Sequence, residues 1–336
     1  MSTQKVTIQD IAKEADAPVV EVMRVIFGQN NLGNDVHNRI YRAMEHLDYV
    51  SIAPGVQKAT GQIGLIAPTV KESDYFRGIF EGISNSANAH GYGISVSLHN
   101  DAVRQNLNAI FSDDKIHGVI IVVPEALDEI VEYSRASDKP FVLVDYNGDD
   151  DISNIPTVSV NNRQAMVQAT QHLINLGHER IGFVTGRMQL ISAQERLAGY
   201  REALNDAGIA YDADLVTHGD WMRPSGEVAG HALLSRAVPP TAVIASNDLM
   251  ALGVMTVALE QGLHVPQDLS IIGFDDIPLV SSISPTLTTI RQPLIEIGKA
   301  AFNLIKDVAN GKAPDNLNVE LSTEFVLRES TARANR

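Results

Sequence analysis

The chain has 336 residues, of which 44% are hydrophobic and 20% charged, with no cysteine and a formal net charge of −15. This composition is typical of a globular protein, and the length suits two or three domains. The absence of cysteine excludes disulfides, thiolate metal sites and cysteine nucleophiles. The acidic balance excludes a protein that coats nucleic acid, because non-specific affinity depends on Lys and Arg at phosphates. Any DNA contact must therefore be local.

The N-terminal residues are polar and follow a helical pattern, unlike a signal peptide. No apolar run reaches the ~18 residues of a membrane span. We therefore expect a cytoplasmic protein.

The first 47 residues contain three short amphipathic segments. Thr7 precedes apolar residues at helical spacing, which predicts a helix over residues 7–15. Further helices are expected over 19–26 and 36–47. This arrangement indicates a small all-α helix-turn-helix domain over residues 1–47. Residues 48–61 lose the apolar period and contain Pro54 and Gly55, which predicts a linker.

From residue 62 onward, short apolar runs alternate with amphipathic helices, the pattern of a parallel α/β sheet with crossover helices. The expected strands are IGLIAP, YGISVSL, GVIIVV, FVLVDY, TVSV, RIGFVTG, TAVIAS and LSIIGFD. The helices expected between them include 76–90, 163–176, 193–207, 225–234 and 248–261. Residues 330–336 are expected to form a frayed tail.

Polar side chains follow several of these strands. Ligands of open α/β sheets bind beyond the carboxyl ends of the strands, which makes these residues candidates for a binding site. They are Asp145, Asn247, Asp248, Asp275 and Asp276. For the carboxylates the alternative is a role as a helix N-cap, and this alternative is strongest for Asp248 and Asp276.

Two further side chains suit a site of this kind. Arg196 brings five fixed N–H donors, which match the paired oxygens of a sugar or a carboxylate. Trp221 is the only tryptophan and lies in a loop, where its ring can stack on an apolar ligand face. A surface ion pair for Arg196 and a place in the core for Trp221 are the structural alternatives.

The stretch from Thr241 to Pro293, with VTIQDIAKEA at 6–15, LGHERIGFVTG at 176–186 and ERLAGYREAL at 195–204, closely resembles the LacI/GalR family of bacterial transcription regulators. The resemblance runs in order over nearly the whole chain. It implies a DNA-binding headpiece, a hinge that folds on DNA, and a two-lobed core similar to periplasmic sugar-binding proteins, in a protein that is usually a dimer. The core would span 62–331. Lobe 1 would comprise about 62–158 and 292–322, and lobe 2 about 159–291 and 323–331.

The resemblance also assigns an effector pocket between the lobes. The matching positions are Asp145, Arg196, Trp221, Asn247 and Asp275, and Tyr75 and Phe76, after the first core strand, are expected to form the opposite wall. Several carboxylates with one Arg favour a neutral polyol, a sugar or nucleoside, because a phosphate calls for more than one cation. No metal and no cofactor other than this small-molecule effector is expected.

By the same resemblance, the second helix enters the major groove of an operator and reads bases through Val19, Val20 and Arg24. Thr7 and Arg39 are expected to contact phosphates or bases. The chain departs from the family pattern at Asp16, where a glycine is usual, at Pro18, Glu21 and Met23, and in the linker. Residues 1–60 carry six Lys and Arg against seven Asp and Glu, a net charge of −1. This charge gives little electrostatic attraction to the phosphates of DNA.

We therefore expect a DNA-binding repressor whose operator affinity is changed allosterically by an effector. The alternative is a family member with a degenerate headpiece that acts through ligand or protein contacts. An enzyme is disfavoured, because no dinucleotide-type glycine loop, G-x-S-x-G elbow or His pair at metal spacing is present. A periplasmic binding protein is disfavoured by the N-terminal helices and by the absence of a signal peptide.

Overall fold

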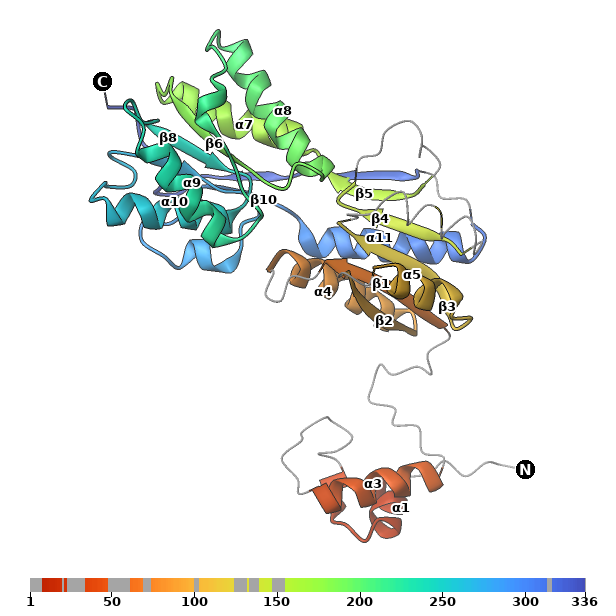
Figure 1. The fold of residues 1–336 in the computed structure, drawn as a ribbon. Coiled ribbons are helices and arrows are strands. Elements are labelled where there is room, and N and C mark those ends of the chain that lie inside the picture. The colour runs from red at the N-terminus through yellow and green to blue at the C-terminus, as the bar shows by residue number, and fades with distance from the viewer. Residues whose placement is uncertain are drawn as a thin grey trace. The chain divides into compact units, whose positions relative to one another are not determined.

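The computed structural model describes residues 8–19, 21–22, 34–47, 61–68, 74–99, 103–123, 132, 139–146, 155–312 and 316–335. These residues divide into two compact units, and each is treated by itself. The smaller unit comprises residues up to 61 with the short stretch 88–93, and the larger comprises the rest of the chain (Figure 1). Within the described residues, no helix is long and apolar enough to cross a membrane.

The N-terminal unit contains helices α1 (Ile8–Glu14) and α3 (Asn34–His46). Between them, Val19, Glu21 and Val22 are helical, and the backbone N–H groups of Glu21 and Val22 donate to the carbonyl of Pro18. The apolar residues at helical spacing form one small core, consisting of Ile11, Ala12, Ala15, Val22, Ile40 and Ala43. The expected positions of the first and third helices agree with α1 and α3 to within two residues. The linker expected over 48–61 lies outside the described residues except for Gly61.

Lobe 1 of the larger unit is built on a six-stranded sheet of order β11-β5-β4-β3-β1-β2. Its strands are β1 (Gly61–Pro68), β2 (Tyr92–His99), β3 (Ile116–Val122), β4 (Phe141–Val144), β5 (Thr157–Val160) and β11 (Asn318–Leu321). The pairs β1–β3, β3–β4, β4–β5 and β5–β11 are all parallel. The helices of this lobe are α4 (Asp74–Ala89), α5 (Val103–Ser112) and α11 (Leu294–Ala309). Helix α11 comes from the C-terminal part of the chain and contacts β3, β4 and β5 (Figure 1).

Lobe 2 has a four-stranded parallel sheet of order β7-β6-β8-β9. Its strands are β6 (Ile181–Thr185), β7 (Val216–His218), β8 (Ala242–Ala245) and β9 (Ser270–Ile272). The helices around it are α7 (Asn162–Asn175), α8 (Ile191–Asp206), α9 (Arg223–Leu234) and α10 (Asp248–Glu260), with the short 3₁₀ turns η2 (Ala213–Leu215) and η3 (Pro278–Ser281). Helices α7 and α8 pack together, as do α9 and α10.

The chain passes between the lobes at three described places. One is the junction of β5 and α7, a second is the junction of β10 (Thr289–Arg291) and α11, and the third is the junction of β11 and β12 (Glu324–Val326). Strands β10 and β12 pair with each other in antiparallel register. The expected fold, a two-lobed α/β core preceded by a small helical domain, is confirmed.

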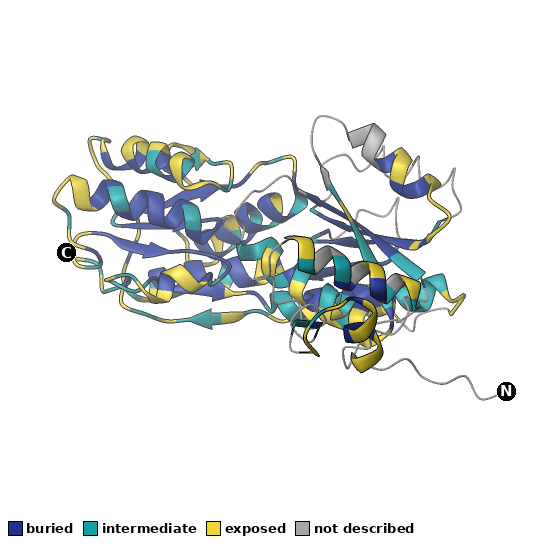
Figure 2. Ribbon diagram, turned by 90° about the horizontal axis from the view of Figure 1, so that it is seen from below, coloured by how far each residue is buried: buried dark blue, intermediate teal, exposed yellow. Residues whose placement is uncertain are grey.

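The apolar runs became strands because both faces of each sheet are covered by helices. Every residue of β4, β5, β6 and β8 is buried, as continuous hydrophobic runs in parallel sheets require. Figure 2 shows the strands buried and the outer faces of the helices exposed. Helix α7 begins one residue before its expected start, because the side chain of Asn161 caps it.

Residues 330–335 do not fray, contrary to the expectation of a frayed tail over 330–336. Ser330 is fully buried, and its backbone and hydroxyl both pair with Ile271 in β9. Further along, Ala332 accepts from Nε2 of His178, and the N–H of Ala334 donates to Leu176. The polar composition of the segment concealed this pairing, because its contacts are hydrogen bonds of backbone groups and of polar side chains such as Ser330, Thr331 and Asn335.

Helices α4 and α11 approach each other closely at two glycines. A Cβ atom on Gly82 would lie 2.1 Å from the carbonyl oxygen of Ile295, and one on Gly298 would lie 2.1 Å from that of Ile79. These contacts are with backbone, which cannot rotate away as a side chain can. The packing of α11 on lobe 1 therefore depends on the absence of side chains at this crossing.

We predict that Gly82→Ala destabilises the core by about 1 to 3 kcal/mol, because the methyl group forces the helices apart. Intrinsic helix propensity acts in the opposite direction by ~1 kcal/mol, so a net loss of stability can come only from the crossing. Urea denaturation of the full chain measures the change. Asn85→Ala, at an exposed position of the same helix, is the control and should be neutral or slightly stabilising. Equal stability of the two variants would contradict the prediction.

Candidate functional site

Left-handed backbone conformations gather where polar residues follow the strands. Six described non-glycine residues have positive φ, and among them are Asp145 (62°), Trp221 (76°), Asp275 (116°) and Asp276 (59°). Such conformations cost about 1 to 3 kcal/mol each and persist where the surroundings enforce them, commonly at binding sites. Three of these four residues are ones that the sequence assigns to the effector pocket.

Arg196 lies at the centre of the group. It is in the second turn of α8 and only 3% exposed. Its guanidinium carbon lies 3.6 Å from the ring centroid of Phe274 and 5.4 Å from that of Trp221. Nε donates to Oδ1 of Asn162 at 2.8 Å, and Nη1 donates to the carbonyl of Ser246. These bonds account for two of its five N–H donors.

Asp145 approaches Arg196 from lobe 1. It follows β4, and its Oδ2 accepts from the hydroxyl of Ser192, at the start of α8, at 3.1 Å. Burial raises the pKa of Asp145 to about 6, although Arg196 and the hydrogen bonds from Ser192 and Asn162 lower it. This carboxyl is therefore close to its midpoint of ionisation near neutral pH, and it is bonded to a side chain of the other lobe.

Asp275 follows β9 in lobe 2. Its Oδ1 accepts from Nε2 of Gln292 at 2.7 Å. Burial raises the pKa of Asp275 to about 7, while Arg196 and Gln292 lower it and the charge of Asp145 raises it further. The other amide atom of Gln292, Oε1, is buried and has no protein partner. A buried polar atom of this kind carries a free-energy cost that a ligand donor can remove.

The two residues expected to form the aromatic wall, Tyr75 and Phe76, lie in different environments. Burial raises the pKa of Tyr75, on α4 of lobe 1, well above its ordinary range, and the negative charges of Asp145 and Asp275 raise it further. The Tyr75 hydroxyl therefore shares the environment of the pocket carboxyls. Phe76 is the next residue of α4, and its ring lies 5.9 Å from that of Phe80, one turn along the helix.

Trp221 is fixed by its backbone and by a glycine beneath it. A Cβ atom on Gly186 would lie 2.0 Å from the Trp221 ring, so only glycine admits the indole at this place. Oxygen of the Trp221 carbonyl accepts from Nδ2 of Asn247 at 2.9 Å. The indole Nε1 is buried and has no hydrogen-bond partner. The ring therefore offers an unused donor in addition to its face.

Asn247 is the N-cap of α10, and its side chain also bonds to the backbone of Trp221. Its Oδ1 accepts from the N–H of Met250 at 3.0 Å, while its Nδ2 holds the loop of Trp221. Asp248, considered as a possible cap, is instead fully buried and accepts from Thr289 Oγ1 at 2.6 Å and from the N–H of Ile277. Burial raises the pKa of Asp248 well above its ordinary range, and the charge of Asp275 raises it further.

The carboxylate of Asp276 forms ion pairs with arginines in and beside the strands that connect the lobes. Its two oxygens accept from Nε of Arg291 and Nη2 of Arg328, both at 2.6 Å. Nη1 of Arg291 also donates to Glu324, so the ion pairs join β10 to β12. Neighbouring carboxyls therefore differ in their contacts, since Asp275 bonds to Gln292 and Asp276 holds the crossover strands.

Four side chains of the site were missed in the sequence, namely Asn162, Ser192, Phe274 and Gln292. Asn162 lies two residues after the end of the strand TVSV. The rule that identified Asp145, a polar residue just after a strand, could therefore have identified Asn162 as well. Ser192 lies at the start of a helix, and Gln292 follows a short strand that leads to the other lobe. Neither residue type by itself indicates a binding site. Phe274 looks like a core residue, and only the fold places its ring face against a guanidinium.

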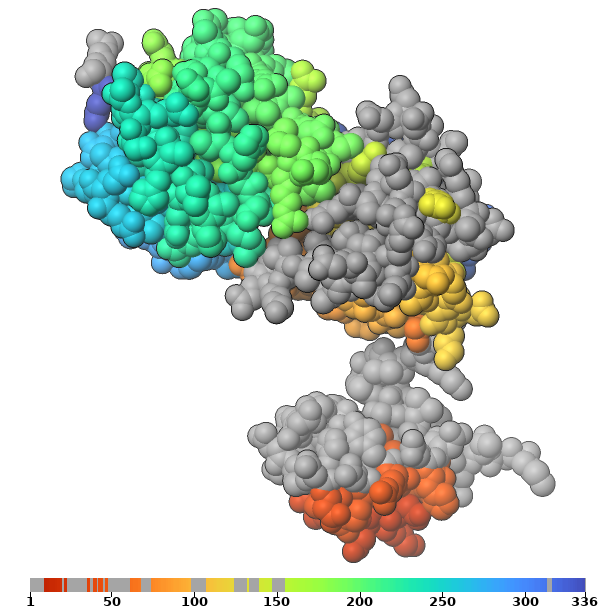
Figure 3. All heavy atoms as spheres, viewed as in Figure 1, coloured from red at the N-terminus to blue at the C-terminus, as the bar shows by residue number. Residues whose placement is uncertain are grey.

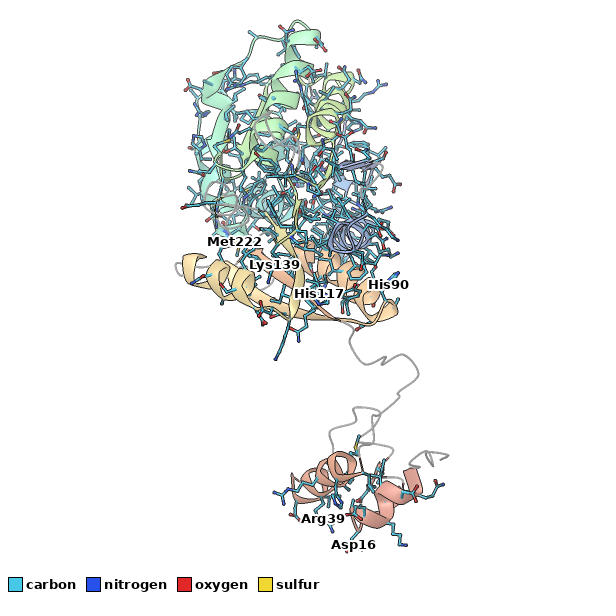
Figure 4. All side chains as sticks on the ribbon, turned by 90° about the vertical axis from the view of Figure 1, so that its right-hand side faces the viewer. Asp16, Arg39, His90, His117, Lys139 and Met222 are labelled. Atoms are coloured by element: carbon cyan, nitrogen blue, oxygen red, sulfur yellow. The ribbon has the colours of Figure 1, made fainter. Side chains whose placement is uncertain are left out.

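The headpiece residues expected at DNA are only partly described. Thr7, Val20 and Arg24 lie outside the described residues. Val19 is 40% exposed at the start of the second helix. Arg39 donates from Nη1 to the carbonyl of Asp16 at 3.1 Å and lies near its carboxylate (Figure 4). It also lies near the carboxylate of Asp35. Its charge is therefore already partly balanced within the headpiece.

The turn at Asp16 explains one departure from the family pattern. Asp16 has φ of 46°, a left-handed conformation in which glycine is favoured and Asp is tolerated. The geometry of the turn is thus the one that a glycine would adopt.

Among the described residues, no group of three or more His, Asp or Glu side chains is arranged to hold a metal ion. The candidate site instead brings together groups that can form hydrogen bonds with hydroxyls: one guanidinium, two carboxyls, a phenol, a carboxamide and an indole. Such a set can recognise a neutral ligand with several hydroxyls through directed hydrogen bonds.

We predict that Asp275→Asn stabilises the protein increasingly as the pH rises from about 4 to 7. A carboxyl whose pKa is raised on folding stabilises the folded state only while it is protonated. Its contribution is therefore lost between the ordinary value of 3.8 and about 7. Each pKa unit corresponds to ~1.4 kcal/mol, so the difference from wild type should reach a few kcal/mol and then stay constant. Urea denaturation at pH 5, 6, 7 and 8 measures it.

Glu329→Gln is the control for this experiment. Glu329 is exposed, and hydrogen bonds from the backbone N–H and the hydroxyl of Thr286 lower its pKa, so it stays ionised between pH 5 and 8. The difference of this variant from wild type should not change between pH 5 and 8. A flat profile for Asp275→Asn as well would show that Asp275 is ionised throughout this range.

The sequence comparisons cover nearly the whole chain. The chain is 32% identical over 332 residues to catabolite control protein A of Priestia megaterium, covering 97% of this chain and 99% of that protein. It is 31% identical over 331 residues to the transcriptional repressor CytR of Escherichia coli K12, covering 97% and 96%. These relatives are transcription regulators rather than enzymes. Residues 170–331 match the family model described as a periplasmic binding protein-like domain.

The comparison with solved structures agrees. The complex of the transcriptional regulator CelR with cellobiose has a TM-score of 0.77 at 27% identity, covering 97% of this chain and 99% of that one. The lac repressor dimer bound to operator and the anti-inducer ONPF has a TM-score of 0.75 at 26% identity, covering 98% and 100%. By its sequence and by the fold of its core, the chain belongs to the LacI/GalR family of bacterial transcription regulators.

Proposed function

We propose that this regulator is a repressor that binds a neutral, hydroxyl-rich effector, a sugar or a nucleoside, in the pocket around Arg196. Occupancy of the pocket changes the separation of the two lobes and, through it, the affinity of the headpieces for an operator. The observation that carries the proposal is the buried guanidinium of Arg196, held between two aromatic rings and facing carboxyls from both lobes.

The chemistry of the pocket favours a neutral ligand. A phosphate binds where several cations converge, whereas this group has one guanidinium and two carboxyls. The unpaired donor at Trp221 Nε1 and the unpaired acceptor at Gln292 Oε1 together suit hydroxyl groups, each of which can donate and accept. The cellobiose complex of CelR is a case of a sugar bound by the same fold.

The effector class can be tested with the natural fluorescence of the protein, because Trp221 is its only tryptophan. Purified protein is titrated with cellobiose, adenosine and glucose 6-phosphate, with emission and calorimetry as parallel readouts. We expect binding of at least one neutral compound and weaker binding of the phosphorylated sugar. Tight binding of glucose 6-phosphate alone would overturn the assignment to a neutral ligand.

We predict that Arg196→Ala lowers the affinity for the compound that wild type binds by roughly 30-fold or more. Loss of charge-assisted hydrogen bonds in a desolvated site costs about 2 to 3 kcal/mol. Arg201→Ala, five residues further along α8, removes an exposed Arg that contacts Tyr211 and should leave the affinity within about twofold. Unchanged affinity in Arg196→Ala would place the effector elsewhere.

DNA binding is supported by the packed core of the headpiece and by relatives such as CytR, which is a repressor by name. A second candidate function, a headpiece that no longer binds an operator, is favoured by one group of observations: the net charge of −1 over residues 1–60 and the pairing of Arg39 with Asp16 and Asp35. Both functions retain the effector pocket, so DNA binding itself separates them.

We predict specific DNA binding with a clear salt dependence. The experiment titrates the protein against the DNA upstream of its own gene, beside a scrambled duplex of equal length, at several salt concentrations. Each phosphate contact contributes about 0.9 to the slope of log affinity against log salt. A preference for the native duplex supports the repressor, and equal weak binding of both duplexes at low salt supports the degenerate headpiece.

We also propose a homodimer, for which lobe 2 offers a candidate surface. Large apolar side chains are exposed on or beside α9, α10 and η3, namely Met222, Val228, Leu259 and Leu279. The three elements share one hydrophobic core, and α9 and α10 face the viewer in Figure 3. Exposed apolar side chains on neighbouring elements make this surface a candidate interface. Sedimentation of wild type against a Leu279→Asp variant tests this surface.

A further inference from the structure

Asp248 is a fully buried carboxyl to which the proposed effector pocket gives no role. It is the first residue of α10 in lobe 2. A buried carboxyl is costly unless its oxygens accept hydrogen bonds, and the bonds of Asp248 lead to one short segment of the chain. This segment, residues 273–277, follows β9 and contains Asp275. We call it the Asp275 turn.

Asp248 holds the Asp275 turn on both sides of Asp275. Its backbone N–H donates to the carbonyl of Phe274 at 2.8 Å, and its Oδ2 accepts from the N–H of Ile277 at 2.9 Å. Between these two attachment points lie Asp275 and Asp276, whose φ values of 116° and 59° are left-handed. Such conformations persist only where the surrounding structure enforces them. Asp248 supplies two of the bonds that enforce them here.

The other oxygen of the carboxyl ties the turn to β10. Oδ1 of Asp248 accepts from Oγ1 of Thr289 at 2.6 Å, and Thr289 is also fully buried. The same strand meets the turn through its backbone, because the N–H of Asp275 donates to the carbonyl of Ile290 at 2.8 Å. Strand β10 leads to α11 of lobe 1. A single carboxyl therefore joins the start of α10, the Asp275 turn and one crossing between the lobes.

The close approach of this carboxyl depends on a glycine at the beginning of the turn. A Cβ atom on Gly273 would lie 2.2 Å from Oδ1 of Asp248 and 3.2 Å from its Cα. Oδ1 is held by Thr289 and the Cα atom is backbone, so neither can move away easily. The carboxyl and the turn are packed as one unit, and the position of the turn depends on the position of the carboxyl.

We propose that Asp248 is a positioning residue of effector binding: it holds the backbone of Asp275 in the conformation from which the Asp275 side chain bonds to Gln292, and it ties that conformation to β10. The inference rests on the proposed function, because it assumes that Asp275 binds the effector. Asp248 acts through Asp275. When the turn is released, the Asp275 carboxyl is still present, but its bonds to Gln292 and to a ligand lose their geometry.

The first test needs no ligand and follows amide hydrogen exchange by mass spectrometry, on fragments that contain the Asp275 turn. Asp248→Ala removes both acceptor oxygens and leaves the backbone bond to Phe274. We expect exchange in the turn to become faster by about tenfold or more, because a local restraint is lost. The amides of β6, in the same sheet, should change by less than about threefold. Equal acceleration in β6 and in the turn would show a general loss of stability and would overturn the positioning role.

Two companion variants isolate the side-chain bonds. Asp248→Asn keeps an acceptor for the N–H of Ile277, and its amide nitrogen can donate to the Thr289 hydroxyl, which accepts as well as donates. It should restore exchange in the turn to within about threefold of wild type. Thr289→Val removes the hydroxyl that holds Oδ1 but keeps the shape of the side chain. It should accelerate exchange in the turn, and it keeps the test valid if Asp248→Ala does not fold.

Thr170→Val is the matched control. Thr170 is as fully buried as Thr289, and its hydroxyl donates to the carbonyl of Met166 within α7. The variant makes the same chemical change away from the turn, where exchange should remain that of wild type. Exchange in the turn that superimposes on wild type in Thr289→Val, and in Asp248→Ala where that variant folds, would overturn the inference.

The second test measures binding of whichever of cellobiose and adenosine binds wild type. Asp248→Ala should lower the affinity by about tenfold or more, and Asp248→Asn should restore it to within about threefold. In a protein that already carries Asp275→Ala, the further change Asp248→Ala should cost less than about threefold, because the residue through which Asp248 acts is gone. Equal losses in the two backgrounds, or no loss in either, would overturn the inference. If neither compound binds wild type, the polyol effector fails, and hydrogen exchange still decides the role of Asp248.

Discussion

The need to neutralise one buried cation organises the ligand-binding core. A guanidinium that is 3% exposed is too costly to bury without partners, and Arg196 obtains them from both lobes and from the crossover. Two aromatic faces, a backbone carbonyl, a carboxamide and two carboxyls surround it. The stacking on Phe274 and Trp221 contributes on the order of 1 to 2 kcal/mol in a desolvated site, and it also fixes the plane in which the remaining donors point.

The two carboxyls near this cation have raised pKa values. Burial raises the pKa of Asp145 to about 6 and that of Asp275 to about 7, even though Arg196 opposes the shift at both. The charges near Arg196 are therefore balanced by protons as well as by the guanidinium. A ligand that supplies hydroxyl groups can replace some of these interactions. The left-handed backbone at Asp145, Trp221 and Asp275 is a strained conformation that the surrounding fold must stabilise.

The fold was largely predictable from the sequence because its strongest signal is local. Continuous apolar runs such as FVLV and AVIA can be buried on both faces only in a parallel sheet, and the helices between them keep a 3.6-residue period. The C-terminal segment was mispredicted because backbone pairing leaves no mark on composition. In the site, residues that follow strands were found by position, whereas Gln292 and Phe274 gained their roles only from tertiary contacts. The same limit applies to Asp276, whose neighbour faces the pocket while its own carboxylate pairs with Arg291 and Arg328.

Asp276 and Asp145 connect different parts of the chain. Asp276 is adjacent to Asp275 and holds Arg291 in β10 and Arg328 just after β12, while Asp145 of lobe 1 accepts from the hydroxyl of Ser192 at the start of α8 in lobe 2. The ion pairs at Asp276 join strands that already pair with each other, so they stiffen one unit. The bond between Ser192 and Asp145 joins groups of different lobes, so it cannot be kept while the lobes separate. A stiff pair of strands beside one breakable link is the arrangement that allows a hinge to take two states rather than a continuous range.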